Sequence, residues 1–475
     1  AMQSSNSLLE ATQKALKTLN GSYGLGIISS NYPDQIIAAR KSSPLVIGIG
    51  DNGNYIASDQ IALLSVTREF IFLEEGDVAE IKINKITIYD FDGNLVNRPI
   101  KTSNLKVGQV DLGNYDHFMQ KEIFEQPQAI RDTLESRLTN HSVVIPAFGF
   151  RAEKIFQKIR QIQIVACGTS FHAGLVAKYW FEDIAKIPCN VEVASEYRYR
   201  HPILLNGTLF VTLSQSGETA DTLAAARAAK QQGCHTVAIC NVPGSRITRE
   251  VDGVIITKSG QEIGVAATKT FLTQMQALYA LAMHLAFQSG SIDHVMLKNW
   301  ENQLRGIPSK ITQLLNSAES IKELVPHISK AKSTFFIGRN INYPLALEGA
   351  LKLKEISYIH AEGYPAGELK HGPLALLSSD TPVIAIAIQD HTYSKLISNI
   401  EEISARSAPV ITVAQKGDKQ ALRVSDYGFE LPEVDPVLSP FLVAVFVQLL
   451  SYYVAHDLGK SIDKPRNLAK SVTVE

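Results

Sequence analysis

Two short segments of the sequence gather hydroxyl groups beside a glycine, a pattern that suits the binding of a phosphate group. Residues 214–219 place three hydroxyls around one glycine, and residues 167–170 place two hydroxyls after another. Hydroxyls and backbone amides can bind a phosphate monoester without a lysine, and neither segment contains one. Helix capping is the alternative, because serine and threonine are common at helix N-termini for structural reasons. The candidate phosphate-binding residues are Cys167, Gly168, Thr169, Ser170, Ser214, Gln215, Ser216 and Thr219.

Three charged residues farther along the chain recur at helical spacing. Glu348, Lys352 and Glu355 stand at positions i, i+4 and i+7, so a helix would place them on one face. The positions between them are mostly apolar, which predicts that this face is partly buried. A partly buried carboxylate near a substrate can have its pKa raised toward neutrality, which suits proton transfer. A solvated face with favourable ion pairs is the alternative.

Two isolated residues also suit chemistry. His371 precedes a Gly-Pro pair, and an unperturbed imidazole titrates close to neutral pH. Lys470 lies near the C-terminus between apolar residues, which predicts that the tail packs against the protein. A desolvated lysine loses affinity for its proton and becomes a nucleophile toward a ketone. An ordinary surface position is the alternative for both residues.

The cysteines do not suggest a reactive or metal-binding centre. Cys167 is followed five residues later by His172, but local spacing alone does not make a nucleophile and base, and a buried cysteine is more often a small apolar residue. The four cysteines include no C-x-x-C pair. We therefore expect no metal, no cofactor and no disulfide framework, and a reducing cytoplasm is the simplest location.

The composition is that of a globular protein of several domains. The chain has 475 residues, which at about 150 residues per domain predicts about three domains. The 46 basic and 47 acidic residues argue against a broad nucleic-acid-binding surface. The most apolar stretch, residues 441–455, is shorter than the roughly 18–20 residues that span a membrane. It predicts a buried core helix.

The elements that must position the candidate residues follow two patterns. Residues 1–106 combine one helical segment, 7–19, with short apolar runs and turn signals, which predicts an α+β piece. From about residue 115, apolar strands alternate with helices, which predicts an α/β fold with parallel sheets covered on both faces. The plan occurs twice, so a duplicated domain is expected. The predicted strands are 23–28, 45–49, 70–73, 79–83, 86–89, 162–166, 208–213, 236–240, 333–337, 382–387 and 410–413.

The two hydroxyl-rich segments resemble the ligand-binding loops of the sugar isomerase (SIS) domain. The likeness extends to a larger family, the glutamine:fructose-6-phosphate amidotransferases, which are glucosamine-6-phosphate synthases. The further segments that carry this resemblance are 239–245 (ICNVPGS), 262–265 (EIGV), 346–362, 367–373 (GELKHGP) and 465–475 (PRNLAKSVTVE). The resemblance is dense over residues 115–475.

The resemblance implies a domain plan. It places two tandem SIS domains, each a doubly wound parallel sheet, at 115–290 and 291–459, and a catalytic tail at 460–475. Residues 1–106 resemble the second half of the family's glutaminase domain. A polar stretch at 107–114 is expected to link this truncated piece to the SIS domains.

The resemblance also implies an activity. Members convert fructose 6-phosphate and ammonia, released from glutamine, into glucosamine 6-phosphate, the first step toward UDP-GlcNAc. It implies that Lys470 forms a Schiff base with C2 and that Glu355 moves a proton between C1 and C2, with Glu348 and Lys352 in supporting roles. His371 would open the sugar ring from the neighbouring subunit, so a homodimer is expected. Further residues expected near the sugar are Val265, Ala267 and Ala469.

The glutaminase chemistry is expected to be absent from this sequence. The family's glutaminase uses an N-terminal cysteine whose α-amino group is the base, whereas this chain begins Ala1-Met2-Gln3. We expect the natural N-terminus to be missing and glutamine not to be hydrolysed. Ammonium-dependent synthesis and slow isomerisation of fructose 6-phosphate remain as hypotheses.

Two other functions fit parts of the pattern. One is a SIS-type isomerase without an ammonia step, and the Lys470 tail argues against it. The other is a sugar-phosphate sensor, which would usually carry a basic DNA-binding segment, and none is visible. No nucleic-acid or membrane partner is expected.

Overall fold

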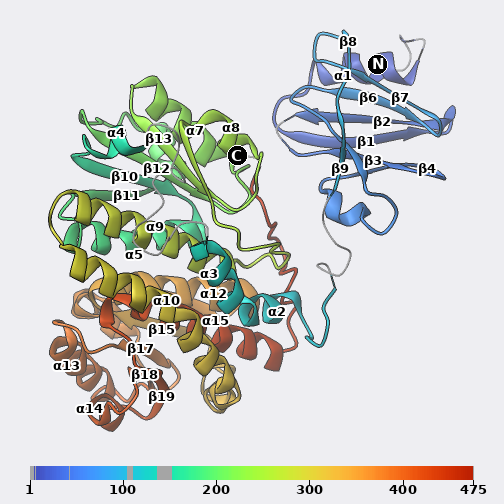
Figure 1. Ribbon diagram of the computed structural model, residues 1–475. Helices are drawn as coiled ribbons and strands as arrows, with labels where there is room; N and C mark the ends of the chain where they lie inside the picture. Colours follow the sequence, from blue (N-terminus) through green and yellow to red (C-terminus); the bar gives the residue numbers. More distant parts are fainter. Residues whose placement is uncertain (1–4, 6, 42, 104–110, 136–151, 474–475) are drawn as a thin grey trace. The chain divides into compact units, whose positions relative to one another are not determined.

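The chain folds into two compact units. The computed structural model describes residues 5, 7–41, 43–103, 111–135 and 152–473 (Figure 1). One unit comprises Ala1–Gly113 with Val472–Glu475, and the other comprises Asn114–Ser471. Of the predicted linker at 107–114, residues 107–110 lie outside the described residues.

The N-terminal unit contains one amphipathic helix and two antiparallel sheets. Helix α1 (Leu8–Leu16) begins where the Ser7 hydroxyl accepts a hydrogen bond from the Glu10 amide at 3.1 Å. One sheet has the order β1-β2-β6-β7-β8 and the other β4-β3-β5-β9. The strands are β1 (Tyr23–Ser29), β2 (Tyr32–Lys41), β3 (Val46–Gly50), β4 (Gly53–Ala57), β5 (Glu69–Phe72), β6 (Val78–Lys82), β7 (Lys85–Tyr89), β8 (Leu95–Val96) and β9 (Ile100–Thr102), with a 3-10 turn η2 (Gln60–Leu63).

The second unit begins with a five-stranded parallel sheet in the order β11-β10-β12-β13-β14. Successive residues of β10 enter different apolar cores, because Ile164 packs with α5 and α9 while Val165 packs with α6 and α7. The elements are α2 (Phe118–Phe124), α3 (Gln126–Glu135), α4 (Ala152–Phe156), β10 (Gln161–Ala166), α5 (Gly168–Asp183), β11 (Cys189–Val193), α6 (Ala194–Tyr199), β12 (Thr208–Ser214), α7 (Ala220–Gln231), β13 (His235–Cys240), α8 (Arg246–Glu250), β14 (Gly253–Ile256) and α9 (Lys269–Gln288). Helices on both faces of a parallel sheet confirm the predicted α/β class.

A second parallel sheet repeats this plan in the order β16-β15-β17-β18-β19. Its elements are α10 (His294–Asn316), α11 (Ala318–Ile321), η5 (Lys322–His327), β15 (Ser333–Gly338), η6 (Asn340–Asn342), α12 (Tyr343–Ser357), β16 (His360–Pro365), η7 (Ala366–His371), η8 (Pro373–Leu376), β17 (Val383–Ala387), α13 (Tyr393–Ser404), β18 (Val410–Gln415), α14 (Lys419–Arg423), β19 (Tyr427–Leu431), η9 (Pro436–Leu438) and α15 (Ser439–Asp457). In both sheets the strand order reverses between the first and the third strand of the domain, where ligands of doubly wound sheets bind.

Helix α15 is the most apolar element of the second unit. The helical segment Pro436–Asp457 is long and apolar enough to span a membrane, so the apolar stretch is longer than the sequence suggested. Its most apolar window is 94% buried inside the protein. This burial is typical of a core helix, in agreement with the prediction, and α15 packs on α12.

Candidate active site

The two hydroxyl-rich segments flank the point at which the strand order of the first sheet reverses. Residues 167–170 follow β10 and open α5, and residues 214–219 follow β12 and precede α7. Gly168 and Gly217 adopt positive φ angles of 53° and 68°, which favour glycine. The Thr219 side chain makes no capping hydrogen bond to α7, so helix capping does not account for its hydroxyl.

Three of these hydroxyl groups form hydrogen bonds within the protein. Ser214 Oγ accepts a hydrogen bond from the Gly217 amide at 2.8 Å, and Ser216 Oγ accepts one from the Glu218 amide at 3.2 Å. These bonds shape the 214–219 loop. Thr169 Oγ1 instead donates to Glu348 Oε1 at 3.0 Å. The structure therefore brings Thr169 to the predicted acid–base residues rather than leaving its hydroxyl open in the loop.

Helix α12 positions Glu348, Lys352 and Glu355 as the spacing predicted. The side chains of Glu348 and Lys352 are fully buried, and that of Glu355 is 22% exposed. Lys352 Nζ lies 2.5 Å from Glu355 Oε2 and 3.6 Å from Glu348 Oε1. The alternative of a solvated helix face is therefore wrong for these residues.

Lys352 remains charged despite its complete burial. Burial alone would lower the pKa of Lys352, but the charges of Glu355 and Glu348 outweigh it and hold that pKa above its usual value. The charge of Glu262 acts on Lys352 in the same direction. The Lys352 ammonium is therefore placed to orient the Glu355 carboxylate, which lies 2.5 Å away.

Helix α5 completes the surroundings of Glu348. His172 Nδ1 lies 2.7 Å from Glu348 Oε2, so the imidazole pairs with this carboxylate. Sequence reasoning considered His172 only as a partner for Cys167. The i, i+3 spacing of Thr169 and His172 on one helix was the available signal. Burial raises the pKa of the Cys167 thiol, which agrees with the rejection of Cys167 as a nucleophile.

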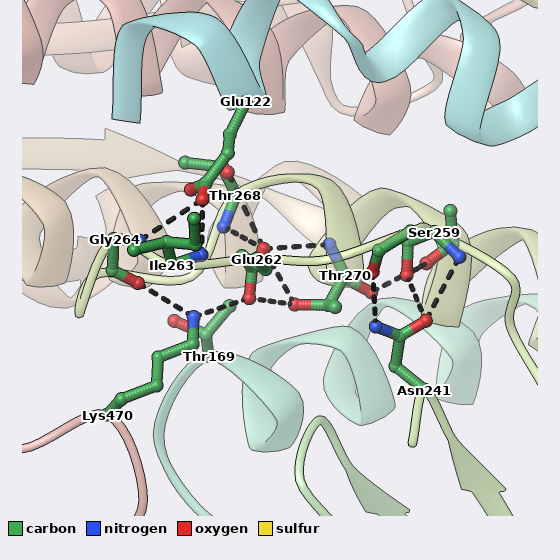
Figure 2. A network of polar contacts seen from close by, with 12 residues as sticks. Glu122, Thr169, Asn241, Ser259, Glu262, Ile263, Gly264, Thr268, Thr270 and Lys470 are labelled. Atoms are coloured by element: carbon green, nitrogen blue, oxygen red, sulfur yellow. Dashed lines mark hydrogen bonds and ion pairs between the residues drawn. The ribbon is translucent and has the colours of Figure 1, made fainter. Parts of the chain in front are cut away.

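Lys470, in the C-terminal tail, forms an ion pair with another buried carboxylate, that of Glu262. Lys470 Nζ lies 2.6 Å from Glu262 Oε2 and donates to the Gly264 carbonyl oxygen at 2.8 Å (Figure 2). The predicted apolar packing of the tail is wrong here, since Leu468 is 46% exposed and Ala469 is also exposed. The position of Lys470 is therefore determined by an ion pair and a hydrogen bond to a carbonyl oxygen. Burial of apolar side chains of the tail contributes little.

Glu262 is itself built into the start of helix α9. Its carboxylate accepts hydrogen bonds from the backbone amides of Thr268 at 2.9 Å and Thr270 at 3.1 Å. Burial alone would raise the pKa of Glu262, but the Lys470 ammonium and these amides outweigh burial and lower that pKa to about 2. A negative charge at a helix N-terminus is also favoured by the helix dipole.

A third buried carboxylate, Glu122 of α2, lies beside the same loop and was missed by sequence reasoning. Its Oε1 accepts hydrogen bonds from the amides of Ile263 and Gly264 (Figure 2). Burial raises the pKa of Glu122 to about 8, and the nearby charge of Glu262 adds to the rise. A lone acidic residue on a short amphipathic helix gives no signal of such burial.

The remaining predicted residues lie in or near these segments. Val265 donates its amide to the Asp463 carbonyl at 3.0 Å, and Ala267 is half-buried in the same loop. His371 is exposed on η7 and has no hydrogen-bonding partner within the part of the chain that the structure describes. The chain alone therefore does not bring His371 to the carboxylate cluster.

Comparison with known proteins identifies the two α/β domains. The model of the SIS domain matches residues 155–284 and 327–456. The glutamine–fructose-6-phosphate aminotransferase (isomerizing) of Haemophilus influenzae is 48% identical over 478 residues, which cover 100% of this chain and 78% of the relative. The chain thus spans about four fifths of the length of that relative.

Solved structures agree with this assignment. The C-terminal domain of glucosamine-fructose-6-phosphate aminotransferase from Francisella tularensis is 42% identical, with a TM-score of 0.73, and the match covers 74% of this chain and 100% of that chain. Glucosamine-6-phosphate deaminase from Thermotoga maritima, 24% identical with a TM-score of 0.59 over 75% of this chain and 99% of that chain, shares the fold. With two SIS domains and this degree of identity, the chain belongs to the glutamine–fructose-6-phosphate aminotransferase (isomerizing) family.

Proposed function

We propose that this chain converts fructose 6-phosphate and ammonia into glucosamine 6-phosphate. One observation carries the proposal. The Lys470 amine and the cluster of Glu348, Lys352 and Glu355 lie near the carboxyl ends of the strands of a doubly wound parallel sheet, where ligands of this fold bind. Lys470 lies on Glu262, and the charge of Glu262 also reaches Lys352 of the cluster. Membership of the family supplies the substrate class.

The first step assigned to the chain is capture of the open-chain sugar. The hydroxyls and amides of residues 214–219, with Ser170, bind the phosphate, and the free amides at the start of α5 and α7 favour an anion. Lys470 gives up a proton, leaves Glu262 and attacks C2 of the ketone. The carbinolamine loses water, and a Schiff base between Nζ and C2 remains.

The second step exchanges the amine and moves a proton. Ammonia adds to C2 and expels the Lys470 amine, which leaves a C2 imine on the sugar. Glu355 then removes a proton from C1 and returns one to C2, while the C1 hydroxyl proton moves to the imine nitrogen, so that C1 becomes the aldehyde and C2 carries the amine of glucosamine 6-phosphate. Lys352, 2.5 Å from Glu355, orients the carboxylate. Glu348, with Thr169 and His172 on its oxygens, fixes Lys352 from the other side.

A homodimer in the cytoplasm completes the proposal. His371 is exposed on η7 and does not reach the carboxylate cluster within its own chain. An exposed residue with this placement is free to act in the site of a second copy, where it would open the sugar ring. We assign residues 460–475 to a catalytic tail and residues 1–106 to a partial glutaminase domain.

A trapping experiment tests the proposal directly. The chain is incubated with fructose 6-phosphate and reduced with borohydride, and the adduct is mapped by mass spectrometry. A hexose phosphate on Lys470, absent from Lys470→Arg, is expected, together with ammonium-dependent glucosamine 6-phosphate. Sugar-phosphate binding by calorimetry without any adduct would favour a binding module. Isomerisation without incorporation of ammonium would favour a plain isomerase.

The source of ammonia is a separate question for the same assay. Ammonium chloride is expected to support synthesis by this chain, whereas glutamine is not. Glutamine-dependent product from the purified chain would contradict the expected loss of glutaminase chemistry.

A further inference from the structure

Helix α2 lies outside the acid–base cluster, yet it bonds to both segments that determine where Lys470 lies. The amides of Phe118 and Met119 each donate to a carboxylate oxygen of Asp463 at 2.9 Å. One helical turn later, Glu122 accepts the amides of Ile263 and Gly264. The helix thus joins the C-terminal tail to the 262–265 loop.

These bonds converge on one peptide unit, the one that links Gly264 to Val265. Its carbonyl oxygen accepts a hydrogen bond from Lys470 Nζ at 2.8 Å, and its N–H donates to the Asp463 carbonyl at 3.0 Å. The preceding amide, that of Gly264, is held by Glu122 at 3.1 Å. A side chain on Gly264 would bring its Cβ within 3.1 Å of Glu122 Oε2, so this close approach suits glycine. The direction of the carbonyl that holds Lys470 is therefore fixed from both sides.

The tail has a second anchor at the end of helix α12. The Arg466 amide donates to the Tyr358 hydroxyl at 2.9 Å, and its guanidinium lies 4.4 Å from the centre of the Tyr358 ring. Asp463 and Arg466 thus both anchor the tail ahead of the short segment 467–469 that leads to Lys470.

We propose that Glu122 and Asp463 are positioning residues for Lys470, which together with α2 orient the Gly264–Val265 peptide and so present the lysine amine to C2 of the sugar phosphate. The inference rests on the proposed function, because it assumes that Lys470 is the nucleophile. In this proposal both carboxylates act through the backbone amides that they accept, and not on the substrate itself. Their effect is on the rate of Schiff-base formation, since a small misplacement of a reacting atom costs more in rate than in binding.

The ionisation of Glu122 makes the trapping rate depend on pH, which a residue with a purely structural role would not do. The charged groups around Glu122 are Glu125, which directly follows α2, Glu262 of the loop, Lys269 of α9, and Asp463 and Lys470 of the tail. Burial raises the pKa of Glu122 to about 8, so the side chain is neutral at pH 7. Above pH 8 its ionisation adds a second negative charge beside Glu262, which stabilises the Lys470 ammonium. Glu122→Gln keeps an oxygen for both amides but cannot ionise.

The experiment compares trapping rates at saturating fructose 6-phosphate with the dissociation constant measured by calorimetry. Glu122→Leu and Asp463→Asn are expected to slow borohydride trapping on Lys470 by about tenfold or more, with affinity changed by less than about threefold. Glu122→Gln is expected to trap at about the wild-type rate at pH 7 and to lose the part of the pH profile that titrates near pH 8. Gln128→Ala, an exposed truncation on the neighbouring helix, is the matched control.

The outcomes separate this inference from the proposed function. Absence of an adduct in the wild-type chain overturns the proposed function and this inference with it. An adduct that forms at the same rate in Glu122→Leu and in the wild type overturns the positioning role alone. Parallel losses of trapping, affinity and melting temperature that Glu122→Gln does not rescue also overturn it. If Glu122→Leu does not fold, the half-buried Asp463→Asn variant decides the matter.

Discussion

The two SIS domains have the same strand order but carry different chemistry after their third strand. In the first domain, β12 is followed by Ser214, Ser216 and Thr219. In the second, β17 is followed by Asp390, whose Oδ1 accepts hydrogen bonds from the amide and the hydroxyl of Thr392 at 2.7 and 2.6 Å. A carboxylate at this position repels an anion. The two domains therefore share their architecture and differ in the loop that follows the third strand, which is hydroxyl-rich in the first domain and carries a carboxylate in the second.

The first helices of the two domains show the complementary difference. Helix α5 contributes a hydroxyl and an imidazole, Thr169 and His172, whereas α12 contributes two carboxyl groups and an amine, Glu348, Glu355 and Lys352. The two helices pack against each other, and the hydrogen bonds from α5 end on Glu348 of α12. The comparison suggests a division in which the first domain binds the phosphate and the second moves the proton.

The largest expected effect is on turnover, and it comes from a substitution of Glu355 that tests this division of roles between the domains. Glu355→Gln is expected to lower ammonium-dependent turnover by about 10²–10⁴-fold, because the amide cannot exchange a proton with C1 or C2. Fructose 6-phosphate binding, measured by calorimetry, is expected to stay within about threefold, since we propose that the phosphate binds in the other domain. The exposed Glu401→Gln on α13 is the control. Loss of binding in Glu355→Gln would break the proposed division.

The second prediction concerns how the buried carboxylates Glu122 and Glu262, which lie near Lys470, make the stability of the protein depend on pH. Glu122 has a folded-state pKa of about 8 against an ordinary 4.5, so its contribution to stability is present below pH 4.5 and is lost as the pH rises through 8. Glu262, with a pKa of about 2, contributes stability that is present above pH 4.5 and is lost as the pH falls toward 2. Lys352, whose pKa is raised above its ordinary 10.5 by the charges of Glu355 and Glu348, contributes stability that is lost only at pH values above 10.5.

Urea unfolding between pH 5 and pH 9 checks this prediction. We expect Glu122→Gln to be more stable than the wild type at pH 9, relative to pH 5, by on the order of 3 kcal/mol. The reason is that the amide has no ionised form to bury. Free energies of unfolding that change in parallel in the two proteins would contradict the buried, protonated state of Glu122.

The third prediction tests the phosphate loop against its counterpart. Ser216→Ala combined with Thr219→Val is expected to weaken fructose 6-phosphate binding by about 10–100-fold, because hydrogen bonds to a charged group contribute about 1.5–3 kcal/mol. Turnover at saturating substrate is expected to change less. Thr392→Val, at the equivalent turn of the second domain, is expected to leave affinity unchanged. Equal effects of the two changes in titration calorimetry would remove the distinction between the domains.

The smallest expected effects come from a feature that the two domains share. Gly174 is the seventh residue of α5 and Gly349 the seventh of α12. A Cβ at Gly174 would lie 2.9 Å from Ile164 of β10, and one at Gly349 would lie 2.7 Å from Phe336 of β15. Each alanine variant is expected to lower the free energy of unfolding by about 1–3 kcal/mol through overpacking.

A third glycine supplies the control for these two. Gly306 lies inside α10, where a Cβ would have no described atom of another residue within 4 Å, so Gly306→Ala is expected to stabilise the chain by up to about 1 kcal/mol. Chemical denaturation of the three variants ranks them. A tolerated alanine at only one of positions 174 and 349 would show that the domains no longer share this helix–sheet contact.

The sequence pattern predicted the centre of each parallel sheet and missed its edges. Strands β10, β12, β13, β15, β17 and β18 correspond to predicted apolar runs. The four missed strands, β11, β14, β16 and β19, are the edge strands. A central strand is buried on both faces and reads as a continuous apolar run, whereas an edge strand such as β16 (HAEGYP) carries polar residues and glycine. In the N-terminal unit, β2 was missed because Pro33 and Asp34 interrupt its apolar pattern.

The candidate site also contains residues that the sequence pattern located correctly and residues that it did not. Helical spacing alone placed Glu348, Lys352 and Glu355 on one face of α12, because three and four residues make one helical turn. The roles drawn from the family resemblance, including those of Lys470 and His371, remain predictions. The apolar packing expected around Lys470 was wrong, since its neighbours in sequence are exposed and its partners are distant in sequence.

By itself, the sequence determined the α/β class, the duplicated plan, the loops at the strand ends and the charged face of α12. These depend on local periodicity and on turn chemistry. Only the tertiary structure decided that Glu262 pairs with Lys470, that Glu122 is buried in its neutral form, and that His172 binds Glu348. Those contacts join residues between 141 and 208 positions apart. Charge pairing and desolvation depend on which groups meet in space, and no local pattern records that meeting.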